Sequence, residues 1–354
     1  MTWLTYRLFR AQAAAGVGAL VIVAILAAIT GPHLAHLYDT SITTCRAPGA
    51  CTAARSALLR SDHLLQSGFG TLVGVAPFLI GIFWGAPLVA HELETGTFRL
   101  AWTQSVTRTR WLALKLGIVG LASIAVAGLL SLLVTWWSSP FDSVNMNPFN
   151  SFDQRDIAPI GYAALGFVIG VTAGMLIRRT LPAMAAALVA LVGARVAVTS
   201  LRPHLFAALR LTIPDNGIIA NVPPSPTASA LDPRDWIISD QTVNASGHVI
   251  GAGGTLFNSP RGISVGPKGV DIAGLGSCPG IKAASVHGRP APLSTAHGNA
   301  LIQRCVDQLR IREVLIYQPA SRYWAFQWYE TAIYVAAALI LAGFCFWWVR
   351  HRLS

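Results

Sequence analysis

The chain alternates between long apolar runs and short polar segments. A helix that crosses the hydrocarbon core of a bilayer needs about 17–25 predominantly apolar residues. Charged residues make up only 12% of the chain and the mean hydropathy is +0.54, which is far too apolar for a soluble globular protein. The pattern predicts an all-α polytopic membrane protein, located in the cell membrane. Its six expected transmembrane helices are Ala13–Ile29, Gly68–Val89, Trp111–Trp137, Ile160–Ile177, Leu181–Val198 and Trp328–Trp348.

The first apolar run has some features of a secretory signal, because Arg7 and Arg10 precede it. However, Gly31–Leu34 is a poor small-residue cleavage site. Aromatic residues also interleave with the two arginines, as they do in a helix that lies at the membrane interface. These aromatic residues are Trp3, Tyr6 and Phe9. We expect an amphipathic elbow helix over residues 1–12, followed by a first span that is retained.

Lysine and arginine residues indicate which side of the membrane each polar segment faces. Short cytoplasmic loops retain these residues. With a cytoplasmic N-terminus, the inner segments would hold ten basic and two acidic residues, while the two shorter outer loops are close to neutral. Both termini are therefore expected in the cytoplasm. The inner basic residues are Arg7, Arg10, Arg99, Arg108, Arg110, Lys115, Arg178, Arg179, Arg350 and Arg352.

The formal net charge of +11 raises the question of a nucleic-acid partner. The basic residues are spread over the membrane flanks and one outer segment rather than concentrated on a single face. The positive-inside distribution explains them. We expect no nucleic-acid partner.

The longest polar segment, residues 200–326, separates the fifth and sixth runs. It is rich in Gly, Ser and Asn and contains short apolar alternations at His248–Ile250 and Gly269–Ile272, which are typical of short strands. Val306–Tyr317 fits a helix or a strand. We predict a large, partly β extracytoplasmic domain or structured loop. The chain accordingly divides into residues 1–199 with five helices, residues 200–326 outside the membrane, and residues 327–354 with the sixth helix and a cytoplasmic tail.

Four of the five cysteines lie in segments assigned to the outside, and an even number of outer cysteines suits disulfide formation. We expect the pairs Cys45–Cys51 and Cys278–Cys305, because each pair shares one loop. A metal site is the alternative, but no CxxC motif or histidine has the spacing of zinc ligands.

Glycines recur at four-residue spacing in two of the expected helices. Such small-residue faces allow helices to pack closely. The contact would lie either within the chain or at a subunit interface. The glycines concerned are Gly70, Gly74, Gly81 and Gly85 in the second run and Gly166, Gly170 and Gly174 in the fourth.

The sequence contains no complete catalytic or nucleotide-binding motif. His91 and Glu92 match the start of HExxH, but Thr95 stands where the second histidine is required. Gly262–Gly266 matches GxSxG, yet Pro267 follows where that motif needs a helix. No GxxxxGK[ST] sequence is present. We expect no enzymatic activity and no metal or cofactor on this chain.

The interiors of the six runs carry no aspartate or glutamate, and Glu330 is expected at the outer rim of the last one. Ion-coupled transporters place carboxylates at membrane depth, so any uphill transport would draw its energy from a separate chain. Arg195, near the outer end of the fifth run, has two interpretations. It either snorkels or pairs with a neighbouring helix, or it contacts an anionic substrate group along a path through the membrane.

A short charged hairpin, residues 90–115, lies between the second and third runs. Glu92 and Glu94 fit the first turn of a short helix, and Gly96 would interrupt that helix or mark a bend. Thr107 is expected to cap the helix of the third run. The hairpin is too small for a domain and too patterned for a linker, so we predict a docking surface.

Two elements of this hairpin, Glu94–Thr97 and Ser105–Arg108, together with Lys115, resemble the first cytoplasmic loop of type-2 ATP-binding-cassette (ABC-2) exporter permeases. The resemblance covers the whole six-span plan. More narrowly, three segments are similar to the actinobacterial branch of that family: Thr2–Thr5, Arg99–Ala113 and Tyr317–Trp324.

The resemblance implies a permease that pairs with cytoplasmic ABC ATPase subunits, as a homodimer or as paired permeases with two ATPases. ATP and Mg would bind to the partner ATPase. In this family the loop after the second span is a coupling helix seated in a groove of the ATPase. The positions that carry the resemblance, and would form or brace that contact, are Glu92, Glu94, Gly96, Thr97, Arg99, Ser105, Thr107 and Arg108.

The expected function is the membrane subunit of an ATP-driven exporter of an amphipathic or lipophilic compound, a lipid or a peptide. The alternative is a membrane-anchored receptor or scaffold whose outer segment, residues 200–326, binds a ligand or partner. An intramembrane enzyme is disfavoured because no nucleophile–base pair or metal-ligand set is present.

Overall fold

The computed structural model forms two compact units, which are described separately: Met1–Arg202 with Tyr323–Ser354, and Pro203–Arg322. The chain is described over residues 2–42, 63–96, 107–142, 147–214, 234–252 and 312–352. Shorter described stretches are residues 51, 54, 57, 231–232, 263–266, 269–272, 276–278, 285–286, 289–290, 304–305 and 307–310. Within these stretches, side chains are described from residue 12 onward, except at residues 63, 214, 250–252, 263–266, 269–272, 276–277, 285–286 and 289–290.

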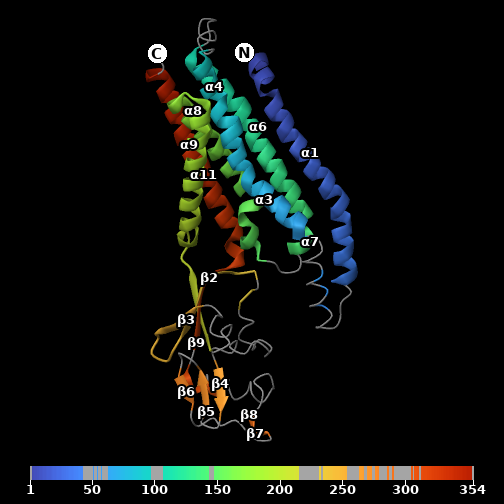
Figure 1. The fold of residues 1–354 in the computed structure, drawn as a ribbon, viewed down its shortest axis with the longest axis vertical. Coiled ribbons are helices and arrows are strands. Elements are labelled where there is room, and N and C mark those ends of the chain that lie inside the picture. The colour runs from blue at the N-terminus through green and yellow to red at the C-terminus, as the bar shows by residue number, and fades with distance from the viewer. Residues whose placement is uncertain are drawn as a thin grey trace. The chain divides into compact units, whose positions relative to one another are not determined.

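The first unit is a bundle of helices, and within its described residues six helices are long and apolar enough to cross a membrane. Each predicted run lies within one of them, so the prediction of six spans is confirmed. Figure 1 shows the helices side by side, with both termini at the same end of the bundle. The elements are α1 (Thr2–Ser41), α3 (His63–Leu79), the π-helix η1 (Ile80–Gly85), α4 (Ala86–Thr95), α6 (Arg108–Trp137), α7 (Ser139–Asp142), the 3-10 helix η2 (Pro148–Gln154), α8 (Ala158–Ile177), α9 (Thr180–Leu201) and α11 (Tyr323–His351).

Helix α1 is longer than the sequence predicts. It runs without interruption over 40 residues, so the expected elbow helix over residues 1–12 is not separate from the first span, and the helix continues well beyond the expected end at Ile29. At about 1.5 Å per residue, this helix exceeds the roughly 30 Å of a hydrocarbon core. It continues past Pro32 because the following turns pack against other helices, and such packing outweighs local propensity. Leu34, two residues beyond the proline, is completely buried.

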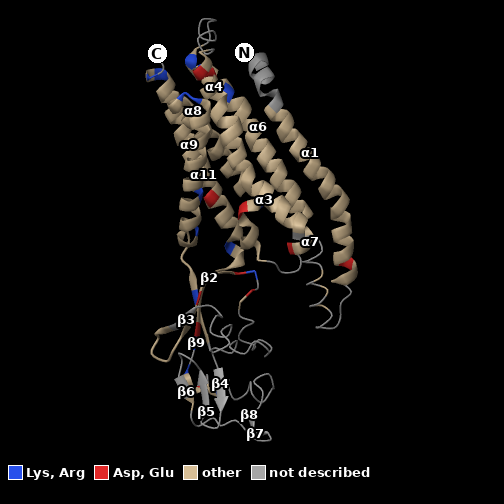
Figure 2. Ribbon diagram, in the orientation of Figure 1, with Lys and Arg blue, Asp and Glu red and all other residues tan. Residues whose placement is uncertain are grey.

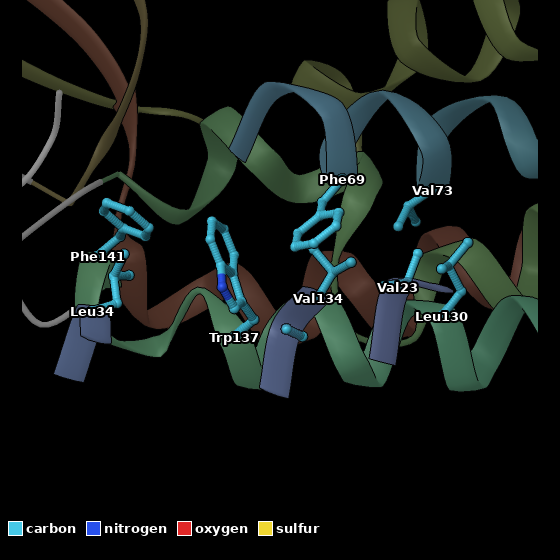
Figure 3. Close-up of a cluster of buried hydrophobic side chains, with 9 residues drawn as sticks. Val23, Leu34, Phe69, Val73, Leu130, Val134, Trp137 and Phe141 are labelled. Carbon is cyan, nitrogen blue, oxygen red and sulfur yellow. The ribbon is translucent and has the colours of Figure 1, made fainter. Parts of the chain in front are cut away.

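That packing forms a buried apolar cluster between α1, α3, α6 and α7 (Figure 3). Phe69 of α3 meets the edge of Trp137 with ring centroids 5.0 Å apart. The indole Nε1 of Trp137 donates a hydrogen bond to the Thr30 hydroxyl at 2.8 Å. Thr30 thus lies inside a packed helix and satisfies the one polar atom of the buried indole.

Helix α8 is the centre of the unit and packs against α3, η1, α4, α6, α9 and α11. Its glycines face those of η1: a Cβ atom at Gly81 would lie 2.7 Å from the Gly166 carbonyl oxygen. A Cβ at Gly174 would lie 2.5 Å from the Ala86 carbonyl oxygen. The glycine face is therefore used within the chain, which is the first of the two predicted alternatives. Gly74 is different, since an added Cβ there would meet nothing within 4 Å.

The second unit is partly β, as predicted. Its largest sheet is antiparallel, with the order β1-β9-β2-β3. A three-stranded sheet has the order β4-β5-β6, and β7 pairs with β8. The strands are β1 (Leu209–Pro214), β2 (Trp236–Val243), β3 (Val249–Ala252), β4 (Ile263–Gly266), β5 (Gly269–Ile272), β6 (Gly276–Cys278), β7 (Ser285–Val286), β8 (Arg289–Pro290) and β9 (Arg312–Gln318).

This unit resolves several sequence-based questions. The second half of the ambiguous stretch Val306–Tyr317 belongs to strand β9, whereas residues 307–309 are helical. Ser264 lies within strand β4, which pairs with β5, so its backbone is not the strand-to-helix turn of a nucleophile elbow. A disulfide joins Cys278 to Cys305, as predicted. In the first unit, Cys51 is also disulfide-bonded. Its predicted partner, Cys45, lies outside the described residues.

Candidate functional site

The candidate site lies where α4 ends and α6 and α9 begin. This is also the end of the bundle at which both chain termini lie (Figure 1). Charged residues gather around the end of α4 and near the C-terminus, whereas the middles of the helices carry few (Figure 2). The two described ends of the predicted hairpin therefore lie at the same end of the bundle as both termini, as the predicted topology requires.

Glu92 and Glu94 lie in the last turns of α4, which continues the second span through η1. The expectation that they open a separate short helix is wrong, because nothing between Val89 and Thr95 breaks the helix. Gly96 ends α4 in the left-handed conformation, with φ of 73°, which glycine adopts without steric cost. Acidic residues at a helix C-terminus face the negative end of its dipole, so both carboxylates need favourable partners elsewhere.

Glu92 finds its partners on α6. Its Oε1 atom lies 2.6 Å from the ammonium of Lys115, and its Oε2 atom accepts a hydrogen bond from Trp111 Nε1 at 3.2 Å. Lys115 is 4% exposed and donates a further hydrogen bond to the Leu88 carbonyl at 2.8 Å. Its ammonium also lies 4.6 Å from the centre of the Trp111 ring, a favourable cation–π distance. The end of α4 is thus fixed to α6 by a largely buried ion pair.

Glu94 finds its partners on α9. Its Oε2 atom accepts hydrogen bonds from the backbone N–H of Thr180 at 3.0 Å and from the Thr180 hydroxyl at 2.7 Å. Thr180 is the first residue of α9, and Arg179, at the capping position, makes no capping hydrogen bond of its own. A carboxylate at a helix N-terminus satisfies an otherwise unpaired N–H and the positive end of the dipole. Glu94 therefore caps α9 from another helix.

Thr107 begins α6 as predicted. It has extended backbone angles, and its hydroxyl accepts a hydrogen bond from the Arg110 backbone N–H at 3.4 Å, which is the geometry of an N-cap. Arg108 and Arg110 follow in the first turn with exposed side chains. Positive charges are unfavourable near the positive end of a helix dipole, so the dipole of α6 does not favour either arginine.

The structure brings together five of the eight predicted coupling positions: Glu92, Glu94, Gly96, Thr107 and Arg108. The other three, Thr97, Arg99 and Ser105, lie outside the described residues. Sequence reasoning did not foresee that α9 takes part. Thr180 begins a helix 86 residues after Glu94, and no local pattern links the two.

A second cluster of charged residues lies inside the bundle, and the sequence analysis did not predict it. Glu330, expected at the outer rim, is completely buried. Its carboxylate accepts hydrogen bonds from Arg202 at 2.7 and 2.8 Å and from the Tyr162 hydroxyl at 2.6 Å. Arg202 also pairs with Asp153 of η2. Buried charges are tolerated when they are paired and hydrogen-bonded in this way.

Arg195 belongs to the same cluster. Its Nη2 atom lies 2.9 Å from an Asp153 carboxylate oxygen, and its guanidinium lies 3.8 Å from the centre of the Tyr162 ring. Arg195 thus pairs with neighbouring elements, as one of its two interpretations requires. Its other interpretation, a contact for a substrate, concerns a ligand and stays a prediction.

Comparison with known proteins identifies the fold family. A family model described as ABC-2 membrane transporter related matches residues 17–202, more than half of the 354 residues. The match begins in α1 and ends at Arg202, where the first unit gives way to the second. Searches of curated proteins and of solved structures found no match. The chain is a multi-pass membrane component of a transporter and belongs to the ABC-2 membrane transporter related family.

Proposed function

We propose that the chain is the permease of an ATP-driven exporter, and that ATP is hydrolysed by a separate cytoplasmic ABC ATPase. The family match supports a transport role. The sequence carries no phosphate-binding loop of its own, which is why ATP and Mg are assigned to the partner. Two permeases, identical or paired, would associate with two ATPases.

The observation that carries the proposal is the double attachment of α4. Glu92 holds its end to α6 through Lys115, and Glu94 holds it to α9 through Thr180. Residues 97–106 connect α4 to α6 along the chain. An ATPase that grips this connection would therefore move α4, α6 and α9 together, and rigid helices pass such movements on to the spans they continue.

Exposed charge supports the same assignment. Arg108 and Arg110 are unfavourable for α6 itself, yet they lie beside the connection that the ATPase would grip. The basic residues at this end also support a cytoplasmic orientation, because cytoplasmic loops retain lysine and arginine. In this orientation the disulfide-bonded second unit would be outside the cell, where disulfides persist.

The transported molecule would be an amphipathic or lipophilic compound, a lipid or a peptide moved outward. The spans are built mainly from Leu, Ala, Val and Gly, which suits a path for an apolar molecule. Glu330 and Arg202 form a buried ion pair between the helices, so polar recognition would occur there.

The test is co-purification of the full chain with the ATPase encoded beside it, followed by ATP-dependent transport in proteoliposomes. Glu94→Ala and Arg108→Ala should each reduce ATPase association or coupled transport. Arg352→Ala is the control, because Arg352 is an exposed arginine that follows α11 and lies outside the segment that connects α4 to α6. If both variants keep full association and coupled transport, this end of the bundle is not the docking surface.

A further inference from the structure

A small cavity lies within the first unit, between α3, α8, α9 and α11. Gly74, Tyr162, Arg195 and Tyr334 are among the residues that line it. Its volume is about 20 Å³, which is room for one water-sized group. The cavity can therefore receive a single functional group of a larger molecule, but not a whole ligand.

Two hydrogen-bonding groups of the lining have no partner. Within the described part of the chain, neither Nη1 of Arg195 nor the hydroxyl of Tyr334 makes a hydrogen bond of good geometry, although the two side chains lie close enough to interact. Tyr334 is only 3% exposed, and a buried polar atom without a partner is unfavourable. A guanidinium N–H can only donate, and a tyrosine hydroxyl can donate. The group that completes both contacts is an acceptor, such as an oxygen atom.

The charges around the cavity indicate what kind of oxygen fits. Arg195 and Arg202 are balanced by the carboxylates of Asp153 and Glu330. The remaining pair, Arg195 Nη1 and Glu330 Oε1, is 4.0 Å apart, close enough for attraction but too long for a hydrogen bond. An anionic guest would add an unbalanced negative charge where charges are poorly solvated. An uncharged acceptor leaves the balance intact.

Access to the cavity is possible past Arg195. Its side chain keeps 21% of its surface exposed, and Val192 and Val196 beside it on α9 are exposed apolar residues. The apolar part of a guest molecule could thus lie along the outside of α9 while one polar group enters the cavity. This arrangement suits a lipophilic molecule with a single polar group.

We propose that this cavity is a recognition subsite of the transporter, which takes one uncharged carbonyl or hydroxyl oxygen of a lipophilic molecule. Nη1 of Arg195 and the hydroxyl of Tyr334 donate the hydrogen bonds, and Gly74 leaves the space. The inference rests on the proposed permease function only in regarding the guest as a transported molecule. It changes the expected role of Arg195 from a contact for an anionic group to a donor for a neutral one.

The test uses the full chain in lipid nanodiscs and tritiated N-decylacetamide as the probe, with empty nanodiscs as the blank. Binding should be saturable and displaced by decan-1-ol, whereas decanoate and decylammonium should compete about tenfold less well. Tyr334→Phe should weaken probe binding by about tenfold, since it removes one hydrogen bond and keeps the ring. Tyr329→Phe, an exposed tyrosine of the same helix, should bind like the wild type.

A second pair of variants tests the space rather than the hydrogen bond. Gly74→Ala adds a methyl group that meets nothing within 4 Å, so the chain should fold, but the cavity shrinks and binding should weaken. Gly68→Ala on the same helix also meets nothing within 4 Å and should leave binding unchanged. If Tyr334→Phe and Gly74→Ala both bind the probe like the wild type, the cavity holds only water and the proposal is wrong. Because the assay contains no ATPase, failure of the permease proposal would not by itself change these results.

Discussion

Glu94, near the end of α4, accepts two hydrogen bonds from Thr180, the first residue of α9, at 3.0 and 2.7 Å. One carboxylate thus caps a helix that is not its own. The contact is exposed, so it contributes little to the stability of the bundle as a whole. Its location beside the connection from α4 to α6 suits transmission of movement better than stabilisation.

Replacing Thr180 should separate these two roles. Thr180→Val removes the hydroxyl donor and keeps the shape of the side chain, so ATP-dependent transport should fall several-fold. The midpoint temperature of thermal unfolding should change little, because the contact is exposed. Thr180→Ser keeps the hydroxyl and should transport like the wild type in the same proteoliposomes. Equal transport by the valine and serine variants would show that the Glu94 cap does not take part in coupling.

The ion pair between Glu92 and Lys115 should matter for stability. Lys115→Met leaves the Glu92 carboxylate largely buried without its cation, which should lower the free energy of unfolding by about 3 kcal/mol. Adding Glu92→Gln should recover most of that loss, since the amide oxygen can still accept the hydrogen bond from Trp111. Denaturant unfolding in lipid nanodiscs measures both. The explanation fails if the double variant is less stable than the single one.

Local sequence signals predicted the parts of this structure that depend on neighbouring residues. Thr107 caps α6, and the glycines of α8 face η1, because capping chemistry and glycine spacing are both readable over a few positions. The six spans followed from apolar length alone. In each case the residues that determine the feature belong to one continuous stretch of the chain.

The features that were missed depend on residues far apart in the chain. Arg202 and Glu330 are separated by 128 residues, and neither has a local pattern that predicts its partner. Helix α1 was ended too early because the apolar run stops at Ile29, whereas the packing of Leu34 against α6 and α7 keeps the helix intact through Pro32. Tertiary contacts of this kind override local propensity. They cannot be predicted from patterns of neighbouring residues.

The contact between α8 and the second span should tolerate no added methyl group. A Cβ at Gly166 would lie 2.6 Å from the Pro77 carbonyl oxygen, closer than atoms in proteins approach. Gly166→Ala should therefore push the helices apart and lower the free energy of unfolding by about 1–3 kcal/mol. Gly193→Ala, in α9, meets nothing within 4 Å and should be neutral or slightly stabilising. Unfolding in nanodiscs compares the pair, and equal stability of the two variants would contradict the close packing.

The cysteines give a test of both the fold and the sidedness of the membrane. Cys345 is a free thiol with no exposed surface, 3.2 Å from the Thr172 hydroxyl, so N-ethylmaleimide should reach it only after unfolding. Cys278 and Cys305 form a disulfide, and Cys45 is predicted to pair with Cys51. Denatured, non-reduced protein should thus take up a single label, at Cys345, and all five cysteines should react after reduction. Mass spectrometry of the labelled peptides locates each label. A label on Cys278 or Cys305 before reduction would contradict the disulfide, and with it the assignment of the second unit to an oxidising compartment.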